Sequence, residues 1–166
     1  MMTKKRQLSH LDANHHVHMV DVGDKAVTER SASAQAIVTL PRACVTVLAA
    51  GGATRKGNVF EVARVAGIMA AKRTSDLIPL CHQIPLAGVA VELVLTGKRL
   101  VITTSARCRG QTGVEMEALT AASVAALTVY DMLKAISHDL VIGPIELLTK
   151  DGGRSGSIDR RTQKLN

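Results

Sequence analysis

Hydrophobic and polar positions along the chain predict six regular elements. Residues 29–40 alternate small or apolar side chains with polar ones up to Pro41, a pattern typical of a strand. Apolar residues then recur at helical spacing over residues 58–73, and Asn58 is a residue type that caps helix N-termini. The remaining predicted elements are a hairpin at 86–108 that turns at 96–98, a long helix at 112–136 and a last strand at 139–150. Pro144 in that last strand indicates an edge position or a bulge.

The order of these elements predicts the fold class. Strand, helix, strand, strand, helix, strand is the order of an α+β fold of the ferredoxin-like, split β-α-β type, with two helices packed on one face of an antiparallel sheet. The 166 residues suffice for one well-packed domain, which we assign to residues 1–157. We expect roughly the first ten residues to be flexible, and residues 158–166 to form a basic C-terminal tail.

Composition and charge limit the classes of partner. The hydrophobic fraction of 46% comes almost wholly from small aliphatic residues, because Phe60 and Tyr130 are the only aromatic residues. The net charge is +7, but residues 1–10 carry three basic and no acidic groups and residues 151–166 carry four basic and two acidic groups, so the ends account for +5. A nearly neutral body argues against a wide surface for duplex nucleic acid and leaves room for a local anion pocket.

Three further classes are disfavoured. RNA-recognition domains share the split β-α-β arrangement, but they stack bases on aromatic residues of the sheet, which this chain does not offer. Cys44, Cys81 and Cys108 are widely spaced without a CxxC pattern, which favours a reducing compartment over a disulfide framework or a zinc knuckle. No stretch reaches about 18 uninterrupted apolar residues, so we expect a cytoplasmic protein with no membrane partner.

Charged residues lie at both ends of the predicted long helix. Asp131 and Lys134 are three residues apart and project from one face, either as a surface ion pair or as a pair tuned for proton transfer. At the other end Glu115 and Glu117 flank Met116, either as binding groups or as acids that complement the helix dipole.

The length of this helix limits how the two ends can be used. Fourteen residues separate Glu117 from Asp131, which is about 21 Å along a helix axis. One small substrate cannot touch both ends of the same helix. A site that uses both therefore requires a large ligand or a second subunit.

Two loops and a Cys-His pair are further candidates. The sequence GGATRKGN places Arg55 and Lys56 just before a helix start, where free backbone N–H groups attract anions, although it lacks the end of a Walker A motif. The segment DGGRSG has similar chemistry but borders the tail. Cys81 and His82 could be a nucleophile and base, metal ligands or core residues. Adjacent side chains on an extended chain point to opposite sides, so His82 alone is the simpler functional interpretation.

A histidine cluster near the N-terminus raises the question of a metal. His15, His16 and His18 are close in sequence, but no cysteine or carboxylate spacing accompanies them that matches a known site. We therefore predict no metal site.

Four motifs together resemble one protein family. They are HMVDVGDK, KGNVFEVARVAGIMAAKRTSDLIPLCH, TGVEMEALTAASVAALTVYDMLKA and GGRSG, and they are similar to the MoaC family of molybdenum cofactor biosynthesis from about Leu8 to Gly156. Two positions depart from the family pattern: Asn58 stands where Asp is usual, and Gln83 stands where Pro is usual. Both lie beside residues that the family uses.

The resemblance implies a reaction and a set of site residues. The reaction converts 3′,8-cyclo-7,8-dihydro-GTP into cyclic pyranopterin monophosphate with release of pyrophosphate, which makes the expected enzyme a lyase. It implies no redox cofactor and allows Mg²⁺ bound with the triphosphate. The implied catalytic residues are Asp131, Lys134, Lys56 and His82. The implied substrate-binding residues are Glu115, Met116, Glu117, Lys25, Arg30, Cys81 and Lys150, among which Lys25, Arg30 and Lys150 would hold phosphate.

The resemblance also implies an assembly. Members of the family form homohexamers, as trimers of dimers with sites at the dimer interface, which would supply the second subunit that the helix length requires. In such a site, residues 72–76 would form a turn that delivers His82 to an anion pocket beside Lys56. A catalytically silent paralogue stays open as an alternative, because the implied catalytic residues are all present.

Overall fold

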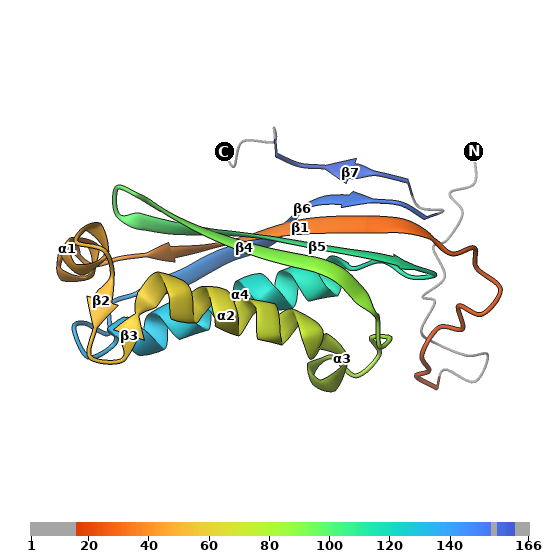
Figure 1. Ribbon diagram of the computed structural model, residues 1–166, viewed down its shortest axis with the longest axis horizontal. Helices are drawn as coiled ribbons and strands as arrows, with labels where there is room; N and C mark the ends of the chain where they lie inside the picture. Colours follow the sequence, from red (N-terminus) through yellow and green to blue (C-terminus); the bar gives the residue numbers. More distant parts are fainter. Residues whose placement is uncertain (1–15, 154–155, 162–166) are drawn as a thin grey trace.

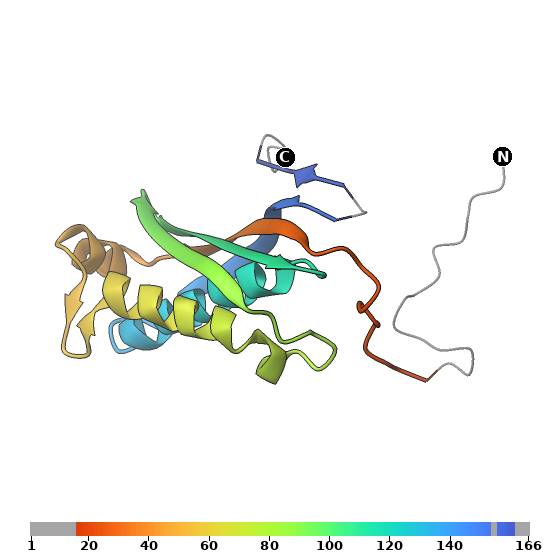
Figure 2. The ribbon, with the colours of Figure 1, turned by 45° about the vertical axis from the view of Figure 1, so that its right-hand side comes forward.

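A single antiparallel sheet and two long helices form the body of the protein. The computed structural model describes residues 16–153 and 156–161. The sheet has the order β4-β5-β1-β6-β7, and helices α2 and α4 lie side by side on one of its faces (Figures 1 and 2). Its strands are β1 (Thr28–Thr39), β4 (Leu86–Thr96), β5 (Arg99–Gly110), β6 (Val141–Asp151) and β7 (Ile158–Asp159). The helices are α1 (Arg42–Ala49), α2 (Val59–Lys72), α3 (Thr74–Leu77) and α4 (Glu115–Leu133), and a separate small hairpin pairs β2 (Ala53–Thr54) with β3 (Gly57–Asn58).

This arrangement confirms the predicted ferredoxin-like class. The central strand β1 pairs antiparallel with β5 on one side and with β6 on the other. The predicted hairpin is β4–β5, and its turn contains Gly97 at a φ of +58°. The register of β1 against β6 shifts between the pairs made by Ala36 and Val38, where the partner strand contains Pro144. A bulge thus accommodates this proline, which has no N–H to donate.

The N-terminus of α2 is capped as the sequence predicts. The side-chain oxygen of Asn58 accepts hydrogen bonds from the backbone N–H groups of Phe60 (3.0 Å) and Glu61 (3.2 Å). Its side-chain nitrogen donates to the carbonyl of Gly51 at 2.7 Å. Asn58 therefore fixes both the start of the helix and the loop that leads into it.

Five elements were not predicted, and two of them are the strands β2 and β3 of the small hairpin, in a segment that was expected to be a loop. Helix α1 contains four consecutive β-branched or Cys residues that favour helix only weakly, and it is held by burying Cys44 and Leu48, which are one turn apart. Residues 74–77 form the short helix α3 rather than the turn that was expected at 72–76. Strand β7 lies in the segment assigned to the tail, and pairs with Thr149 and Lys150. Residues 1–10 and 162–166, for which we predicted flexible ends, lie outside the described residues.

Helix α4 forms the centre of the core. Ala121, Ala122, Ala125 and Ala126 are fully buried between the sheet and α2, so the small side chains predicted from composition let these layers approach closely. By length and composition α4 could also cross a membrane, but more than half of that stretch is buried inside the domain. Its apolar character is explained by its place in the core.

Gly67 marks the closest approach of α2 to α4. A Cβ added at this residue would lie 3.0 Å from the carbonyl oxygen of Ala121 and 3.3 Å from the Cβ of Ala125. It would also lie 3.1 Å from a methyl group of Val91 on β4. The spacing of α2, α4 and β4 thus depends on the missing side chain.

We expect Gly67→Val to destabilise the protein by roughly 1–3 kcal/mol, because the added methyl groups have no space between α2, α4 and β4. Chemical denaturation measures the free energy of unfolding. Ala66→Val is the matched control, since it adds a side chain of the same type one residue earlier, at a half-buried position. Equal stability of the two variants would contradict the role given to Gly67.

Candidate active site

The predicted site residues fall into two groups at opposite ends of α4. Lys56, Asp131 and Lys134 meet at its C-terminal end, beside the β2–β3 hairpin. The other predicted residues surround its N-terminal end and line two adjoining hollows: Lys25, Arg30, Cys81, His82, Glu115, Met116, Glu117 and Lys150. Charged side chains therefore lie at both ends of this helix, as the sequence predicts.

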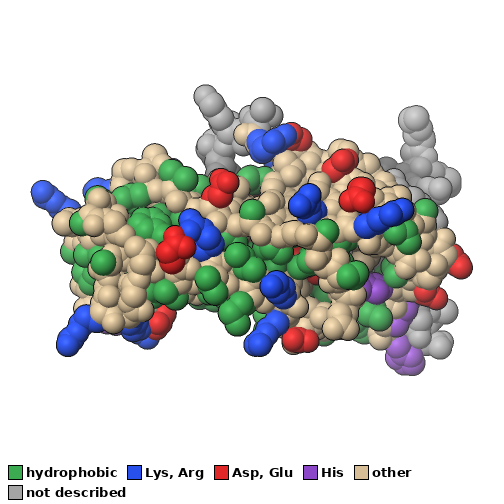
Figure 3. All heavy atoms as spheres, viewed as in Figure 1, with side chains coloured by type: hydrophobic (Ala, Val, Ile, Leu, Met, Phe, Trp, Pro, Cys, Tyr) green, Lys and Arg blue, Asp and Glu red, His purple; other side chains and the backbone are tan. Residues whose placement is uncertain are grey.

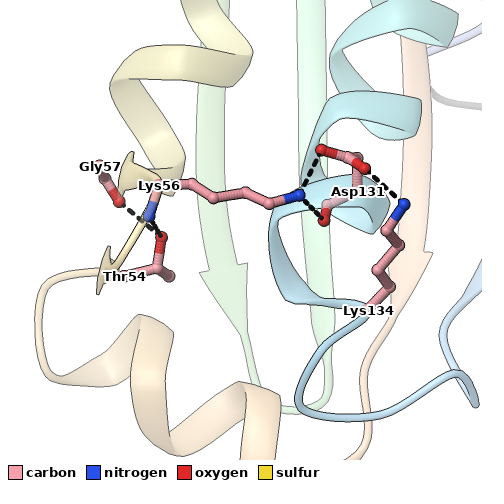
Figure 4. Close-up of polar contacts among 5 residues, drawn as sticks. All are labelled: Thr54, Lys56, Gly57, Asp131 and Lys134. Carbon is pink, nitrogen blue, oxygen red and sulfur yellow. Dashed lines mark hydrogen bonds and ion pairs between the residues drawn. The ribbon is translucent and has the colours of Figure 1, made fainter.

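At the C-terminal end two lysines hold one carboxylate. Lys134 Nζ lies 2.8 Å from one oxygen of Asp131, and Lys56 Nζ lies 2.8 Å from the other (Figure 4). Lys56 also donates to the backbone carbonyl of Asp131 at 3.0 Å. The residues Lys56 and Asp131 are 75 positions apart in sequence, so this part of the cluster is created by the packing of α2 on α4.

The turn that carries Lys56 is itself braced. The hydroxyl of Thr54 donates to the carbonyl of Gly57 at 2.8 Å and accepts from the backbone N–H of Lys56 at 3.2 Å. Gly57 adopts a φ of +110°, a conformation that residues with a side chain rarely take. The short hairpin therefore presents Lys56 in a defined direction, toward Asp131.

This cluster is charged and open to solvent. Hydrogen bonds from Lys134 and Lys56 lower the pKa of Asp131 to about 2, so the carboxylate is ionised at any ordinary pH. The same carboxylate raises the pKa of Lys134, which keeps that ammonium group protonated. About half of each side chain is exposed. The cluster thus combines a permanent anion with cations that a ligand can reach.

The larger hollow at the N-terminal end is a cationic pocket. Its volume is about 770 Å³ and its lining includes Lys25, Arg30 and Lys150. Lys150 Nζ lies 3.0 Å from a carboxylate oxygen of Glu115, and Arg30 Nε donates to the carbonyl of Gly110 at 2.9 Å. These contacts hold Lys150 and Arg30 in place. The three cations outnumber the single carboxylate among the lining residues, so the pocket suits an anionic ligand.

Two glycines after β6 pack beside this pocket, and the second of them, Gly153, lines it. Gly152 and Gly153 have φ angles of +93° and +80°. A Cβ on Gly152 would collide with the backbone carbonyl of Glu29, and one on Gly153 would collide with the guanidinium group of Arg30. The DGGRSG segment therefore contributes close packing around Arg30. Its Arg154 lies outside the described residues.

The smaller hollow contains a buried acid. Glu117 is only 3% exposed, and one of its carboxyl oxygens has no hydrogen-bond partner among the described residues. Burial is the main reason that the pKa of Glu117 is raised, which favours the neutral acid. Burial and the nearby Glu117 also raise the pKa of Cys81, which disfavours a thiolate nucleophile. A buried polar oxygen without a partner is a place where a ligand could supply one.

His82 is tied to the N-terminal segment. Its Nε2 donates to the carbonyl of Val20 at 2.8 Å, because a carbonyl oxygen can only accept, so Nε2 carries a proton. Cys81 and His82 both line the same hollow of about 390 Å³. Within one protomer His82 lies at the opposite end of α4 from Lys56, so the expected placement beside Lys56 is not made inside a single chain.

Sequence reasoning missed three polar residues of the larger pocket, Thr28, Gln111 and Thr112. Gln111 lies between β5 and α4, and its amide donates to the carbonyls of Gly23 and Lys25. Thr28 has a buried hydroxyl without a partner among the described residues. Gln111 directly precedes the TGVEME motif, which was the available signal. One member of the histidine cluster, His15, lies outside the described residues. Among the residues that the structure describes, no group of three or more His, Cys, Asp or Glu side chains is arranged to hold a metal ion.

The fold and these two groups of charged residues define an α+β protein with a large cationic pocket and a lysine–carboxylate cluster. Residues 19–153 match the MoaC family, and the chain belongs to that family. One similar protein is the cyclic pyranopterin monophosphate synthase of Herpetosiphon aurantiacus. It is 55% identical over 151 residues, which cover 90% of this chain and 92% of that protein. The resemblance based on the four motifs is confirmed.

The raised pKa of Glu117 predicts a pH dependence of stability. Because the folded protein binds this proton more tightly than the unfolded chain, the contribution is favourable at low pH and is lost as pH rises above the ordinary pKa of Glu toward the raised value. We expect Glu117→Gln, which cannot ionise, to gain stability relative to the parent as the pH rises above the ordinary pKa of Glu, which is roughly 4.

Denaturation of both proteins without ligand at each pH measures this difference. Glu92→Gln, at an exposed position of β4, is the control for removing one carboxylate. A stability difference between Glu117→Gln and the parent that does not change with pH would show that Glu117 is ionised in the folded protein.

Proposed function

We propose that this chain is a cyclic pyranopterin monophosphate synthase, a lyase that converts 3′,8-cyclo-7,8-dihydro-GTP into cyclic pyranopterin monophosphate and pyrophosphate. The observation that carries the proposal is the 55% identity, over 90% of the chain, to a protein of that name. The cationic pocket supports it because the substrate has a triphosphate, and the lysine–carboxylate cluster supports it because ring opening and pterin formation require repeated proton transfers.

In this proposal the pocket formed by Lys25, Arg30 and Lys150 binds the triphosphate. Closing the cyclic phosphate forms a bond from a sugar hydroxyl oxygen to the α-phosphorus and breaks the bond from that phosphorus to the departing pyrophosphate. The leaving group gains negative charge as this bond breaks. A cationic group close to the α-phosphorus would stabilise that developing charge.

The charges of the other cluster suggest a division of roles. A carboxylate with a pKa of about 2 is a weak base and is never a useful acid near neutral pH. Asp131 is therefore better suited to orient Lys56 and Lys134, and its charge raises the pKa of Lys134. The two ammonium groups would then donate protons to the substrate and return to the neutral form only transiently.

A second copy of the chain would bring the two groups of residues together. They are separated by about 21 Å along α4 of one protomer, which exceeds the reach of one reacting centre. Hydrophobic side chains gather over α2 in Figure 3, and Val62, Val65 and Met69 are exposed along one face of this helix. We infer a homohexamer built as a trimer of dimers, with Lys56 and Asp131 of one protomer beside His82 of its partner.

The remaining parts of the proposal follow from the reaction. The enzyme would act in the cytoplasm on a small-molecule substrate, without a redox cofactor, and Mg²⁺ would take part only as an ion that arrives with the triphosphate. Neither a nucleic acid nor a membrane is needed as a partner.

Incubating the purified chain with 3′,8-cyclo-7,8-dihydro-GTP tests the reaction directly. We expect the pterin product and pyrophosphate to appear in equal amounts. Binding of the substrate without any product would instead support a catalytically silent paralogue.

We expect Asp131→Asn and Lys134→Ala each to lower kcat by roughly 100-fold or more, while binding of a triphosphate ligand weakens much less. Loss of the Asp131 charge also removes the interaction that raises the pKa of Lys134. If a protonated lysine is the acid, the alkaline limb of the pH–rate profile should therefore move to lower pH in Asp131→Asn. Single-turnover product formation across pH measures both effects.

Two comparisons make this result interpretable. Asp139→Asn removes a carboxylate that contacts Ser137 rather than the lysines, and should leave the rate unchanged. Arg30→Ala and Lys150→Ala should mainly weaken ligand binding, because groups assigned to phosphate hold ground and transition states alike. If Asp131→Asn formed product at the same rate as the parent, the cluster would be a surface ion pair without a catalytic role.

We expect light scattering at micromolar concentration to give a mass several times the 17.6 kDa of one chain. Val65→Asp should lower that mass, because it places a charge on the exposed apolar face of α2. Lys98→Asp introduces the same acid in the exposed β4–β5 turn and should leave the mass unchanged. A monomeric parent would remove the shared site from the proposal.

A further inference from the structure

Gln111 connects the turn that carries Lys25 to the rigid part of the domain. Its Nε2 donates to the carbonyl of Gly23 at 2.8 Å and to the carbonyl of Lys25 at 3.0 Å. The two hydrogens of one amide nitrogen thus bond to two carbonyl groups of the same turn, which are two residues apart. Gln111 itself follows directly after β5, three residues before the buried Val114 that precedes α4.

Among the described residues, the other hydrogen bonds of this turn are internal to it. Its internal bonds run from the Lys25 N–H to the Val22 carbonyl at 2.9 Å, and from the Gly23 N–H to the Asp21 side chain at 2.8 Å. These bonds give the turn its shape, but they do not attach it to the domain. Gln111 makes that attachment at the position of Lys25, whereas His82 attaches the chain five residues earlier, at Val20.

The same short connection also holds a second cation. Arg30 Nε donates to the carbonyl of Gly110, the neighbour of Gln111. Gly113 follows two residues after Gln111, and a Cβ there would collide with the carboxylate of Glu115. The β5–α4 connection thus sets the positions of Lys25 and Arg30 and allows the carboxylate of Glu115 to lie close to the backbone.

We propose that Gln111 is a positioning residue, whose two hydrogen bonds hold Lys25 in the cationic pocket for a phosphate group of the ligand. This rests on the proposed function only in the identity of the ligand. A cation fixed in advance binds phosphate more tightly than one on a loose turn, because the loss of conformational freedom has already occurred on folding. Gln111 acts through Lys25 and not by contact with the reacting atoms.

A double-mutant cycle with inorganic pyrophosphate as the probe tests this directly. Gln111→Met keeps the length and neutrality of the side chain but cannot donate, and should weaken binding about fivefold, the loss typical of hydrogen bonds that hold a group in place. Lys25→Ala should weaken binding about tenfold or more. In the Lys25→Ala background Gln111→Met should have almost no further effect, because there is no ammonium group left to position.

Two measurements separate positioning from a general structural effect. Hydrogen exchange of the backbone amides at residues 22–25 should be faster in Gln111→Met than in the parent, while exchange in α4 stays the same. Gln35→Met, on the central strand, is the matched control and should change neither binding nor exchange in the turn. Isothermal calorimetry on the assembled protein gives the affinities.

Several results would overturn the inference. If the effects of Gln111→Met and Lys25→Ala multiply fully, Gln111 acts independently of Lys25. Unchanged exchange at residues 22–25 would mean that the two hydrogen bonds do not hold the turn. If the parent does not bind pyrophosphate, the phosphate role of Lys25 is wrong and the inference fails with it. If the parent binds pyrophosphate but does not convert the cyclic dihydro-GTP, only the proposed reaction fails, and the cycle still decides the role of Gln111.

Discussion

Close packing of α2 against α4 is the contact on which the rest of the structure depends. Gly67 lets the backbone of α2 approach Ala121 and Ala125, so the two helices and the sheet form one core made of small side chains. This packing also sets the position of the hairpin that precedes α2. Lys56 reaches Asp131 only because the start of α2 lies beside the end of α4. The charged cluster is therefore a consequence of how the core is filled.

The rigidity of α4 keeps the two groups of site residues apart within one chain. A buried helix of 19 residues cannot bend to bring its ends together, so the lysine–carboxylate cluster and the cationic pocket stay apart in one chain. The exposed apolar residues of α2 lie between these ends. An assembly that covers this face would relieve the exposure of Val65 and Met69 and could complete the site in the same step.

The main elements were predictable because their signals are local. Alternation predicts β1, the cap at Asn58 predicts the start of α2, and the spacing of Asp131 and Lys134 predicts their pairing. Helix α1 was missed because its stability comes from burying Cys44 and Leu48 rather than from its own sequence. Strand β7 was missed because it has only two residues, which are too few to show the alternation of apolar and polar side chains that is typical of a strand.

The sequence predicted which residues belong to the candidate site better than it predicted how they are arranged in space. The family motifs named the charged side chains, but the contact of Lys56 with Asp131 spans 75 positions and depends on the tertiary packing. The separation of His82 from Lys56 within one chain has the same origin. Gln111 was missed because its effect comes through backbone carbonyls of a distant turn, which leave no pattern in the sequence.

The balance of charge differs between the two ends of α4, and this difference indicates what each end is for. At the C-terminal end the carboxylate of Asp131 is paired with both lysines in the absence of any ligand, so a substrate there would share cations that are already oriented. At the N-terminal end three cations face one paired carboxylate, while the second acid is buried and favours its neutral form. That end therefore carries an excess of positive charge until a polyanion binds. Binding energy is thus available mainly from the pocket, and the exposed cluster is left free for chemistry.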